Sequence, residues 1–242
     1  MPSQPLYSFA EIARVSSPYR QKFAIPRQPN LVKEARGKLL FDPEYSDANA
    51  LRGLEQFSHL WLIFVFHAVA EDGWSATVQP PRLGGKEHIG VFASRSMFRP
   101  NPIGLSVVEN LGWEQQTDKL ILHVGGLDLL DGTPILDIKP YLPYADSLSD
   151  ASAGYASEIP GGRHTVIFKP EARQQLEQLH ANYPELENFI AAVLQQDPRP
   201  AWRQKDNDDK QYGMSLYDLN IKWRVQGSTI QVLSVKQLLD AS

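Results

Sequence analysis

Three aspartates near the middle of the chain are the residues best placed to do chemistry. Asp128, Asp131 and Asp137 fall within ten positions, and each has hydrophobic neighbours. An aspartate at the end of a strand can accept hydrogen bonds from ribose hydroxyls or from an amino group. Each also fits a simpler role as the cap of a turn. For Asp131 the two interpretations are equally strong, because it precedes Gly132 and Asp-Gly is a turn dipeptide.

Arginine and histidine side chains supply a second kind of functional group. Arg95 and Arg99 come just before a Pro-Asn-Pro segment at 100–102, which can be neither regular helix nor central strand. The stretch 22–29 likewise combines cations, an amide and two prolines. An arginine in such a loop can bind a carboxylate through two parallel hydrogen bonds. His67 follows the most apolar run of the chain, where we expect either a buried, hydrogen-bonded core histidine or a functional group.

Several classes of site are missing from the sequence. There is no cysteine, which excludes disulfides, thiolate nucleophiles and iron–sulfur clusters. The six histidines show no pair at metal-ligand spacing such as H-x-x-x-H, so we expect no metal site. The glycine-rich signatures of triphosphate and dinucleotide binding are absent, as is the G-x-S-x-G nucleophile elbow.

Short apolar segments must position these groups, and they are typical of strands. Residues 58–67 are almost all apolar, β-branched or aromatic, which predicts a strand buried on both faces. Clusters of Gly, Pro and Asp separate the segments. Short strands with little helix between them favour a closed or nearly closed barrel. Further strands are expected at 6–14, 89–93, 105–108, 119–124 and 134–138, with a short helix at 48–56.

The pattern changes after residue 140. Residues 140–162 are rich in Pro, Ser, Ala, Gly and Asp, which indicates a long loop or linker. A strand at 164–168, a helix from Pro170 and a second helix near Pro184 follow, the second with an apolar stripe at helical spacing. Residues 211–225 and 229–235 are expected to form a closing hairpin. The sequence thus predicts a small α+β domain after the barrel.

Composition and charge are those of a soluble globular protein. The chain has 242 residues with 42% apolar and 21% charged side chains, no visible secretory signal and no apolar run long enough to span a bilayer. The net charge is −4, but seven Lys/Arg against one acid lie between Arg14 and Lys38. Four more cations lie between Arg82 and Arg99. Such patches are either solvated loops or sites for phosphate.

Several longer strings of the sequence resemble the motifs of one family, in that family's order. They are Ser17-Pro-Tyr19, Phe23-Ala-Ile-Pro-Arg-Gln-Pro29, Arg52-Gly-Leu-Glu-Gln-Phe-Ser-His-Leu-Trp61, Gly90-Val-Phe-Ala-Ser-Arg-Ser96, Arg99-Pro-Asn-Pro-Ile-Gly104, residues 127–134, Asp137-Ile-Lys-Pro-Tyr141 and Asp197-Pro-Arg-Pro-Ala201. The chain resembles, along nearly its whole length, the TrmO (TsaA-like) family of S-adenosylmethionine-dependent tRNA methyltransferases. Trp202 stands where this family is expected to have a tyrosine.

The resemblance implies a mainly β, non-Rossmann methyltransferase in the cytoplasm that forms a homodimer. It implies a catalytic barrel at residues 1–145 and a small α+β domain at 163–242. The reaction would be methylation of N6 in the threonylcarbamoyl-modified adenosine 37 beside a tRNA anticodon. Two rival classes remain: a module that only binds S-adenosylmethionine or tRNA, and a methyltransferase with a different acceptor.

The resemblance also assigns residues to roles. The proton acceptor is left open among three candidates: His67, Asp128 and Asp131. Cofactor binding is expected of Arg27, Gln28, Pro29, His67, Ala68, Arg95, Leu105, Asp128, Leu129, Leu130 and Asp131. Substrate binding is expected of Arg99, Asn101, Lys139, Tyr141, Arg199, Trp202 and Arg203.

A separate prediction concerns the stretch 197–205. Its two prolines end the preceding helix, so it should be an extended, exposed loop. There Arg199 and Arg203 would contact phosphates and Trp202 would stack on an unpaired base. The alternative is that Trp202 packs back onto the helices and the charges are solvated.

Overall fold

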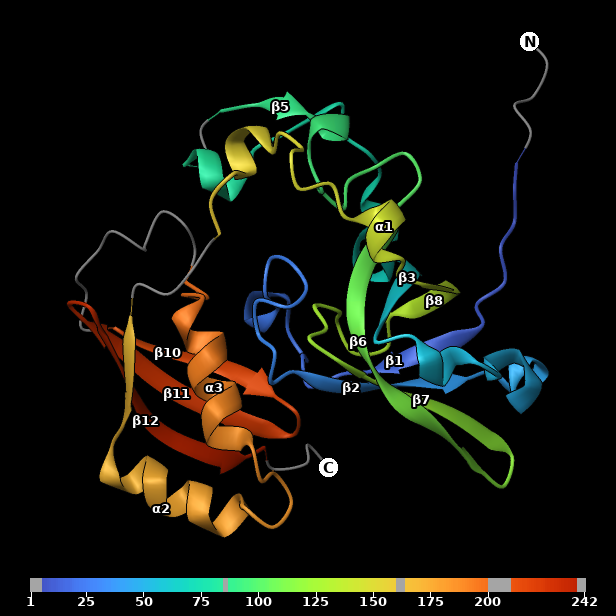
Figure 1. The fold of residues 1–242 in the computed structure, drawn as a ribbon. Coiled ribbons are helices and arrows are strands. Elements are labelled where there is room, and N and C mark those ends of the chain that lie inside the picture. The colour runs from blue at the N-terminus through green and yellow to red at the C-terminus, as the bar shows by residue number, and fades with distance from the viewer. Residues whose placement is uncertain (1–5, 85–86, 160–163, 200–209, 239–242) are drawn as a thin grey trace.

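A computed structural model describes residues 6–84, 87–159, 164–199 and 210–238 of the chain. Figure 1 shows a barrel built by the first part of the chain, a second sheet with two helices built by the last part, and a layer of short elements above the barrel. Within the described residues, no helix is long and apolar enough to cross a membrane.

The barrel is closed by six antiparallel strands in the order β1-β2-β7-β6-β3-β8. Closure leaves the barrel with no unpaired edge strand. The strands are β1 (Ala13–Ser16), β2 (Arg36–Phe41), β3 (His59–Val65), β6 (Ile103–Gln116), β7 (Lys119–Gly125) and β8 (Pro134–Pro140). A two-stranded ribbon, β4 (Thr77–Val78) with β5 (Ile89–Gly90), belongs to the layer above.

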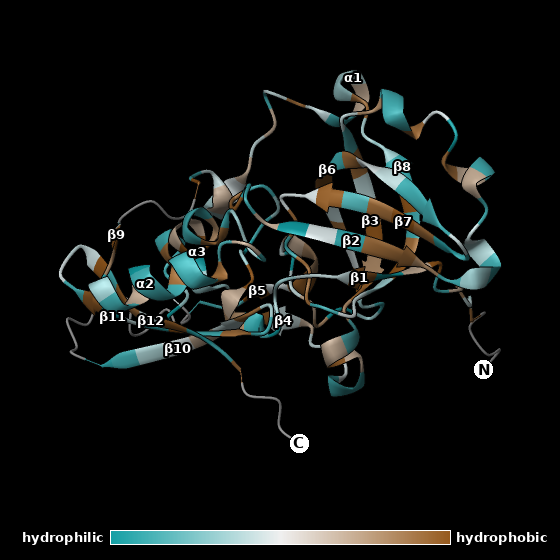
Figure 2. Cartoon of the chain, turned by 90° about the horizontal axis from the view of Figure 1, so that it is seen from below, coloured by the Kyte–Doolittle hydropathy of each residue, from teal (hydrophilic) through white to brown (hydrophobic). Residues whose placement is uncertain are grey.

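One face of each barrel strand points into the core, and β3 shows this alternation clearly. Leu60, Leu62 and Phe64 are buried, whereas the residues between them are only half-buried. The prediction that both faces of this strand are buried was therefore wrong. An apolar residue on the outer face of a barrel strand stays near solvent, because only the inner face lies in the core. In Figure 2 the hydrophobic colour runs along β3, β6 and β7.

Other elements differ from the sequence predictions in their boundaries. The strand expected at 6–14 is the shorter β1, which begins only at Ala13. Strand β2 was not predicted, because Arg36, Gly37 and Lys38 interrupt its apolar pattern. Residues 89–93 form only the short β5, followed by a turn of 3-10 helix. The helix expected at 48–56 is two 3-10 turns, Ala48–Leu51 and Leu54–Gln56, separated by Gly53 at φ +89°. That left-handed conformation breaks a helix and suits glycine.

The C-terminal domain is a four-stranded sheet covered by two α-helices (Figure 1). Its strand order is β10-β11-β12-β9, and β9 pairs with β12 in parallel. Helices α2 and α3 pack against β12 and β9. The bounds are β9 (Thr165–Phe168), α2 (Pro170–Leu179), α3 (Leu186–Gln195), β10 (Gln211–Leu216), β11 (Leu219–Gln226) and β12 (Thr229–Gln237). The predicted hairpin is thus three strands, with an extra turn at Tyr217, where φ is +54°.

The barrel and the C-terminal domain share a continuous core. Tyr19, which follows β1, is fully buried, and its ring centroid lies 5.9 Å from that of Phe189 in α3. The backbone N–H of Tyr217 donates to the carbonyl of Pro18 at 2.7 Å. Along the chain, the short helix α1 (Pro143–Asp146) comes between the two parts. The prediction of a mainly β chain with an N-terminal barrel and a C-terminal α+β domain is confirmed.

Candidate functional site

A cavity of about 1000 Å³ lies at one end of the barrel, between its loops and the layer above. Its size is at the upper end of what small-molecule sites occupy. Ten of the eleven residues predicted to bind cofactor line it: Arg27, Gln28, Pro29, His67, Ala68, Arg95, Leu105, Asp128, Leu129 and Leu130. The structure therefore brings together residues that are up to about a hundred positions apart in the sequence.

The loop with Arg27, Gln28 and Pro29 is held to the barrel by the residue that follows it. Asn30 adopts a left-handed conformation at φ +61°, and its amide donates to the carbonyl of Val107 at 3.1 Å. Its backbone N–H donates to the carbonyl of Gly126 at 2.8 Å. Gly126 also has a positive φ, and a Cβ there would clash with the Asn30 side chain. These contacts place the Arg27 loop beside β6 and the start of the aspartate loop.

Asp128 is the acidic group of the cavity. Its carboxylate accepts a 2.5 Å hydrogen bond from the hydroxyl of Ser106, a buried residue on β6. Burial raises the pKa of Asp128 to about 6, although the bond from Ser106 and the positive charge of Arg95 both pull it down. The group therefore titrates near neutral pH, where a carboxylate can act as a base or hold a cation.

Arginines form the cationic side of the same cavity. Arg95 donates to the side-chain carbonyl of Gln28 at 2.5 Å, so two of the predicted residues orient each other. Burial lowers the pKa of Arg27, and the nearby positive charge of Arg82 lowers it further, while the charge of Asp197 acts in the opposite direction. Two guanidinium groups that repel each other at one wall favour an anionic ligand.

His67 lies at the cavity wall, directly after β3, and is half-buried. Its ring makes no hydrogen bond with any group in the part of the chain that the structure describes. The alternative of a buried, hydrogen-bonded core histidine does not describe it. His67 is instead a ring at the wall of the cavity, available to a ligand.

Asp131 is not among the residues that line the cavity. Its carboxylate accepts from the backbone N–H of Ser17 at 2.8 Å and forms an ion pair with Arg20. Arg20 in turn donates to the carbonyl of Tyr217 at 3.3 Å, in the C-terminal domain. Through Arg20, Asp131 thus helps to join the barrel to the C-terminal domain. We no longer count it among the catalytic and cofactor-binding candidates.

The predicted substrate residues of the barrel have different surroundings. Arg99 donates to the carbonyls of Ser94 and Val91 at 2.9 and 3.2 Å, so it shapes its own loop. Lys139 pairs with Asp137 at 2.7 Å on an exposed surface. Asn101 is exposed and does not line the large cavity. Tyr141 lines a second, smaller cavity beside the first.

In the C-terminal domain the expectation of an exposed cation at Arg199 is wrong. Its side chain is 1% exposed and donates to both carboxylate oxygens of Asp197 at 2.8 Å. The same carboxylate lies 3.4 Å from His164. A buried ion pair explains the Asp-Pro-Arg spacing, since a charge removed from water needs a partner. Trp202 and Arg203 lie outside the described residues.

Ser106 is a functional candidate that the sequence reasoning missed, and Arg82 was noted only as part of a basic stretch. Ser106 lies near the start of β6 and Arg82 in a short 3-10 helix, so neither has a local signature. Only the pairing of β6 with the aspartate loop reveals Ser106. Among the described residues, no group of three or more His, Asp or Glu could hold a metal ion.

Comparison with known proteins places the chain in a family. A model of the tRNA-methyltransferase O N-terminal domain matches residues 14–147, and one of the TrmO C-terminal domain matches residues 162–238. The chain belongs to the tRNA-methyltransferase O family. It is 51% identical, over 95% of its length and 98% of the relative's, to the tRNA (adenine(37)-N6)-methyltransferase of Escherichia coli.

Further relatives agree with this assignment. A putative S-adenosylmethionine-dependent methyltransferase, RcsF, of Pseudomonas aeruginosa is 45% identical over 95% of this chain and 97% of that protein. A crystal structure of TrmO from Pseudomonas aeruginosa superimposes with a TM-score of 0.81 at 38% identity, covering 98% of this chain and all of that one. The family resemblance seen in the sequence is confirmed.

Proposed function

We propose that this protein transfers a methyl group from S-adenosylmethionine to N6 of adenosine 37 in tRNA. The observation that carries the proposal is the cavity itself, which joins a carboxylate of raised pKa to several arginines. It does so in a chain of the tRNA-methyltransferase O family that is 51% identical to a tRNA (adenine(37)-N6)-methyltransferase. The matches to residues 14–147 and 162–238 support a catalytic barrel at 1–145 and a smaller domain at 163–242.

The residues of the cavity fit S-adenosylmethionine. Arg95, oriented by Gln28, can hold the methionyl carboxylate. Leu105, Leu129 and Leu130 offer apolar surface for the adenine ring, as small-molecule sites usually do. The Asp128 carboxylate can attract the sulfonium cation or accept from the ribose hydroxyls. The cofactor supplies an electrophilic methyl group, so the protein's contribution is above all to position the acceptor.

The acceptor nitrogen must lose a proton as its bond to the methyl carbon forms and the carbon–sulfur bond breaks. We assign the proton to Asp128, because its raised pKa of about 6 is close to the working pH, as general-base catalysis requires. His67, which lines the same cavity, is the alternative. The pH dependence of kcat in Asp128→Asn and His67→Ala separates the two, since only the loss of the true base removes the acidic limb.

We further propose that the acceptor carries a threonylcarbamoyl group on N6. Its carboxylate matches the cationic wall around Arg27 and Arg82. In that acceptor the nitrogen belongs to a ureido group, which makes removal of its proton easier than from adenine. Equal methylation of modified and unmodified tRNA transcripts would contradict this part of the proposal.

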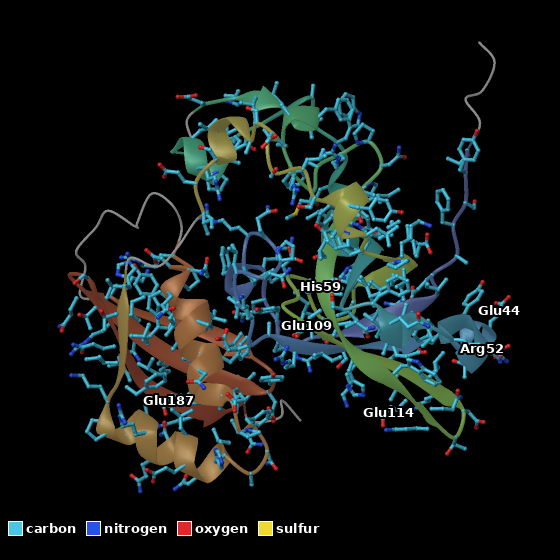
Figure 3. The ribbon with its side chains drawn as sticks, in the orientation of Figure 1. Glu44, Arg52, His59, Glu109, Glu114 and Glu187 are labelled. Carbon is cyan, nitrogen blue, oxygen red and sulfur yellow. The ribbon has the colours of Figure 1, made fainter. Side chains whose placement is uncertain are left out.

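The deciding experiment is methyl transfer to purified tRNA followed by mass analysis of the nucleosides. Wild-type protein should place one methyl group on the base at position 37. Arg95→Ala should lose cofactor binding in isothermal titration while its melting temperature is unchanged. Arg52→Ala, an exposed arginine beside Glu44 (Figure 3) that does not line the cavity, is the matched control and should behave as wild type. Cofactor binding without any transfer would leave only a binding module.

We also propose that the enzyme is a cytoplasmic homodimer. The large exposed apolar side chain of Trp74, in the layer above the barrel, supports a covered surface there. Sedimentation of wild-type protein against Trp74→Ser tests this, because removal of a contact ring should shift the equilibrium toward the monomer.

A further inference from the structure

A second cavity of about 390 Å³ lies on the outer face of the barrel. It is lined by His59 and Trp61 of β3, Val107 of β6, Tyr141 and Asp146, and we call it the ring pocket. Pro29, Arg95 and Leu105 line both the ring pocket and the large cavity. A group in the ring pocket therefore adjoins whatever occupies the large cavity.

The strand pattern explains why aromatic rings gather on this face. Leu60 and Leu62 point into the barrel, so His59 and Trp61 project from the opposite face of β3. Trp61 lies directly opposite Val107 on β6 and Lys139 on β8. Figure 3 shows His59 beside its cross-strand neighbour Glu109.

Contacts between the rings, together with hydrogen bonds, hold these side chains in place. The ring centroid of Tyr141 lies 5.8 Å from that of Trp61 and 6.4 Å from that of His59. The Tyr141 backbone N–H donates to the carbonyl of His59 at 3.0 Å. The indole N–H of Trp61 donates to Asp146 Oδ2 at 3.0 Å, and the backbone N–H of Leu142 donates to the same oxygen at 2.8 Å. The α1 helix is thereby fixed over β3.

The ring pocket combines three features that suit a nucleobase. Its aromatic rings offer faces for stacking, which is a main source of affinity for unpaired bases. Asp146 Oδ1 accepts no hydrogen bond from the described residues, so it can accept from the N–H group of a base. Pro29, Arg95 and Leu105 form the border with the large cavity, so a base in the ring pocket would lie next to the group bound there.

We propose that the ring pocket binds the acceptor base itself, turned out of the anticodon loop, with its N6 directed across Leu105 into the large cavity. This proposal depends on the proposed function, because it names where that acceptor is held. Trp61 and Tyr141 are then binding residues for the base, and His59 limits the pocket at its far end. A base held there reaches the cofactor cavity without entering it completely.

The test is steady-state methyl transfer with tRNA as the varied substrate. Trp61→Ala should raise KM for tRNA by roughly 5- to 100-fold, the range expected for the loss of one base stack. Its Kd for S-adenosylmethionine should not change. Trp61→Phe keeps a ring and should recover most of the affinity. Tyr144→Ala, an 86% exposed ring on the same helix α1, is the matched control and should match wild type.

Other outcomes overturn the proposal. An unchanged KM in Trp61→Ala, with an active wild type, removes the base from this pocket while the proposed function stands. If wild-type protein methylates no tRNA, the proposed function itself fails. A shift of Trp61→Ala from dimer to monomer in sedimentation would assign the pocket to contact with a second copy. If Trp61→Ala does not fold, His59→Ala provides a second comparison, because the ring of His59 lines the same pocket and its centroid lies 6.4 Å from that of Tyr141.

Discussion

Asp128 and Asp131 lie three residues apart in the loop between β7 and β8, yet their carboxylates have different partners. Asp128 lines the cavity and accepts from the neutral hydroxyl of Ser106. Asp131 forms an ion pair with Arg20, which also contacts the C-terminal domain. The first carboxylate keeps its charge available to a ligand, whereas the second has its charge neutralised within the protein.

The same contrast separates the arginines of the two regions. At the cavity, Arg95 is oriented by the neutral amide of Gln28. In the C-terminal domain, Arg199 is buried against the carboxylate of Asp197. Neutral partners position a charged group without cancelling its charge, which suits a binding site. Charged partners satisfy each other, which suits a structural role. The comparison predicts how each residue responds to substitution.

The largest effect is expected from Arg199→Ala. Removing one partner of a buried ion pair leaves the other charge uncompensated, so the free energy of unfolding should fall by about 3–5 kcal/mol. Thermal or urea unfolding measures it, with the exposed Lys222→Ala as the control that should change little. A normal melting temperature combined with weak tRNA binding would return Arg199 to the substrate-binding residues.

Asp128→Asn should have the opposite profile. The loss of a charged group that contacts the ligand costs about 2–3 kcal/mol of cofactor affinity, roughly a 30- to 150-fold rise in Kd. The protein should not become less stable at neutral pH, because burial disfavours the carboxylate of Asp128 in the folded state. Titration with S-adenosylmethionine and a melting curve test both halves. A stability loss without an affinity loss would make Asp128 a structural residue like Asp131.

The pH dependence of stability sharpens the assignment of Asp128. Its pKa in the folded state is raised to about 6, so the native state holds the proton more tightly than the unfolded chain does. Its contribution to stability is therefore fully present below about pH 4 and is lost as pH rises to about 6, by ~1–3 kcal/mol. The difference in unfolding free energy between wild type and Asp128→Asn should change over this interval. If this difference in unfolding free energy stays constant with pH, the pKa of Asp128 is not raised in the folded state.

Arg20→Ala should give the smallest effect. The Arg20–Asp131 pair is half-exposed, so its loss should cost at most about 1 kcal/mol. Because Asp131 continues the loop of Asp128, cofactor affinity should weaken by only a few-fold. Arg36→Ala breaks a similarly exposed pair with Glu109 and should not alter cofactor affinity. If Arg20→Ala weakens cofactor binding as much as Asp128→Asn does, the Arg20–Asp131 pair is essential to the binding site and does more than support its loop.

The sequence alone determined the mainly β class, the small second domain and many of the residues that line the large cavity. Short apolar runs separated by Gly and Pro clusters predicted the barrel, and long family motifs identified Arg27, Arg95 and Asp128. Local pattern could carry this much because alternation, turn chemistry and motif strings are all properties of neighbouring residues.

Only the tertiary structure decided which of these polar groups face the large cavity. Asp131 and Arg199 look as functional in sequence as Asp128 and Arg95, but their partners, Arg20 and Asp197, already neutralise them. Ser106 and the ring pocket depend on the pairing of β3, β6 and β8, which brings residues from distant segments onto one face. The availability of a charge depends on what surrounds it in space, and residue order does not contain that information.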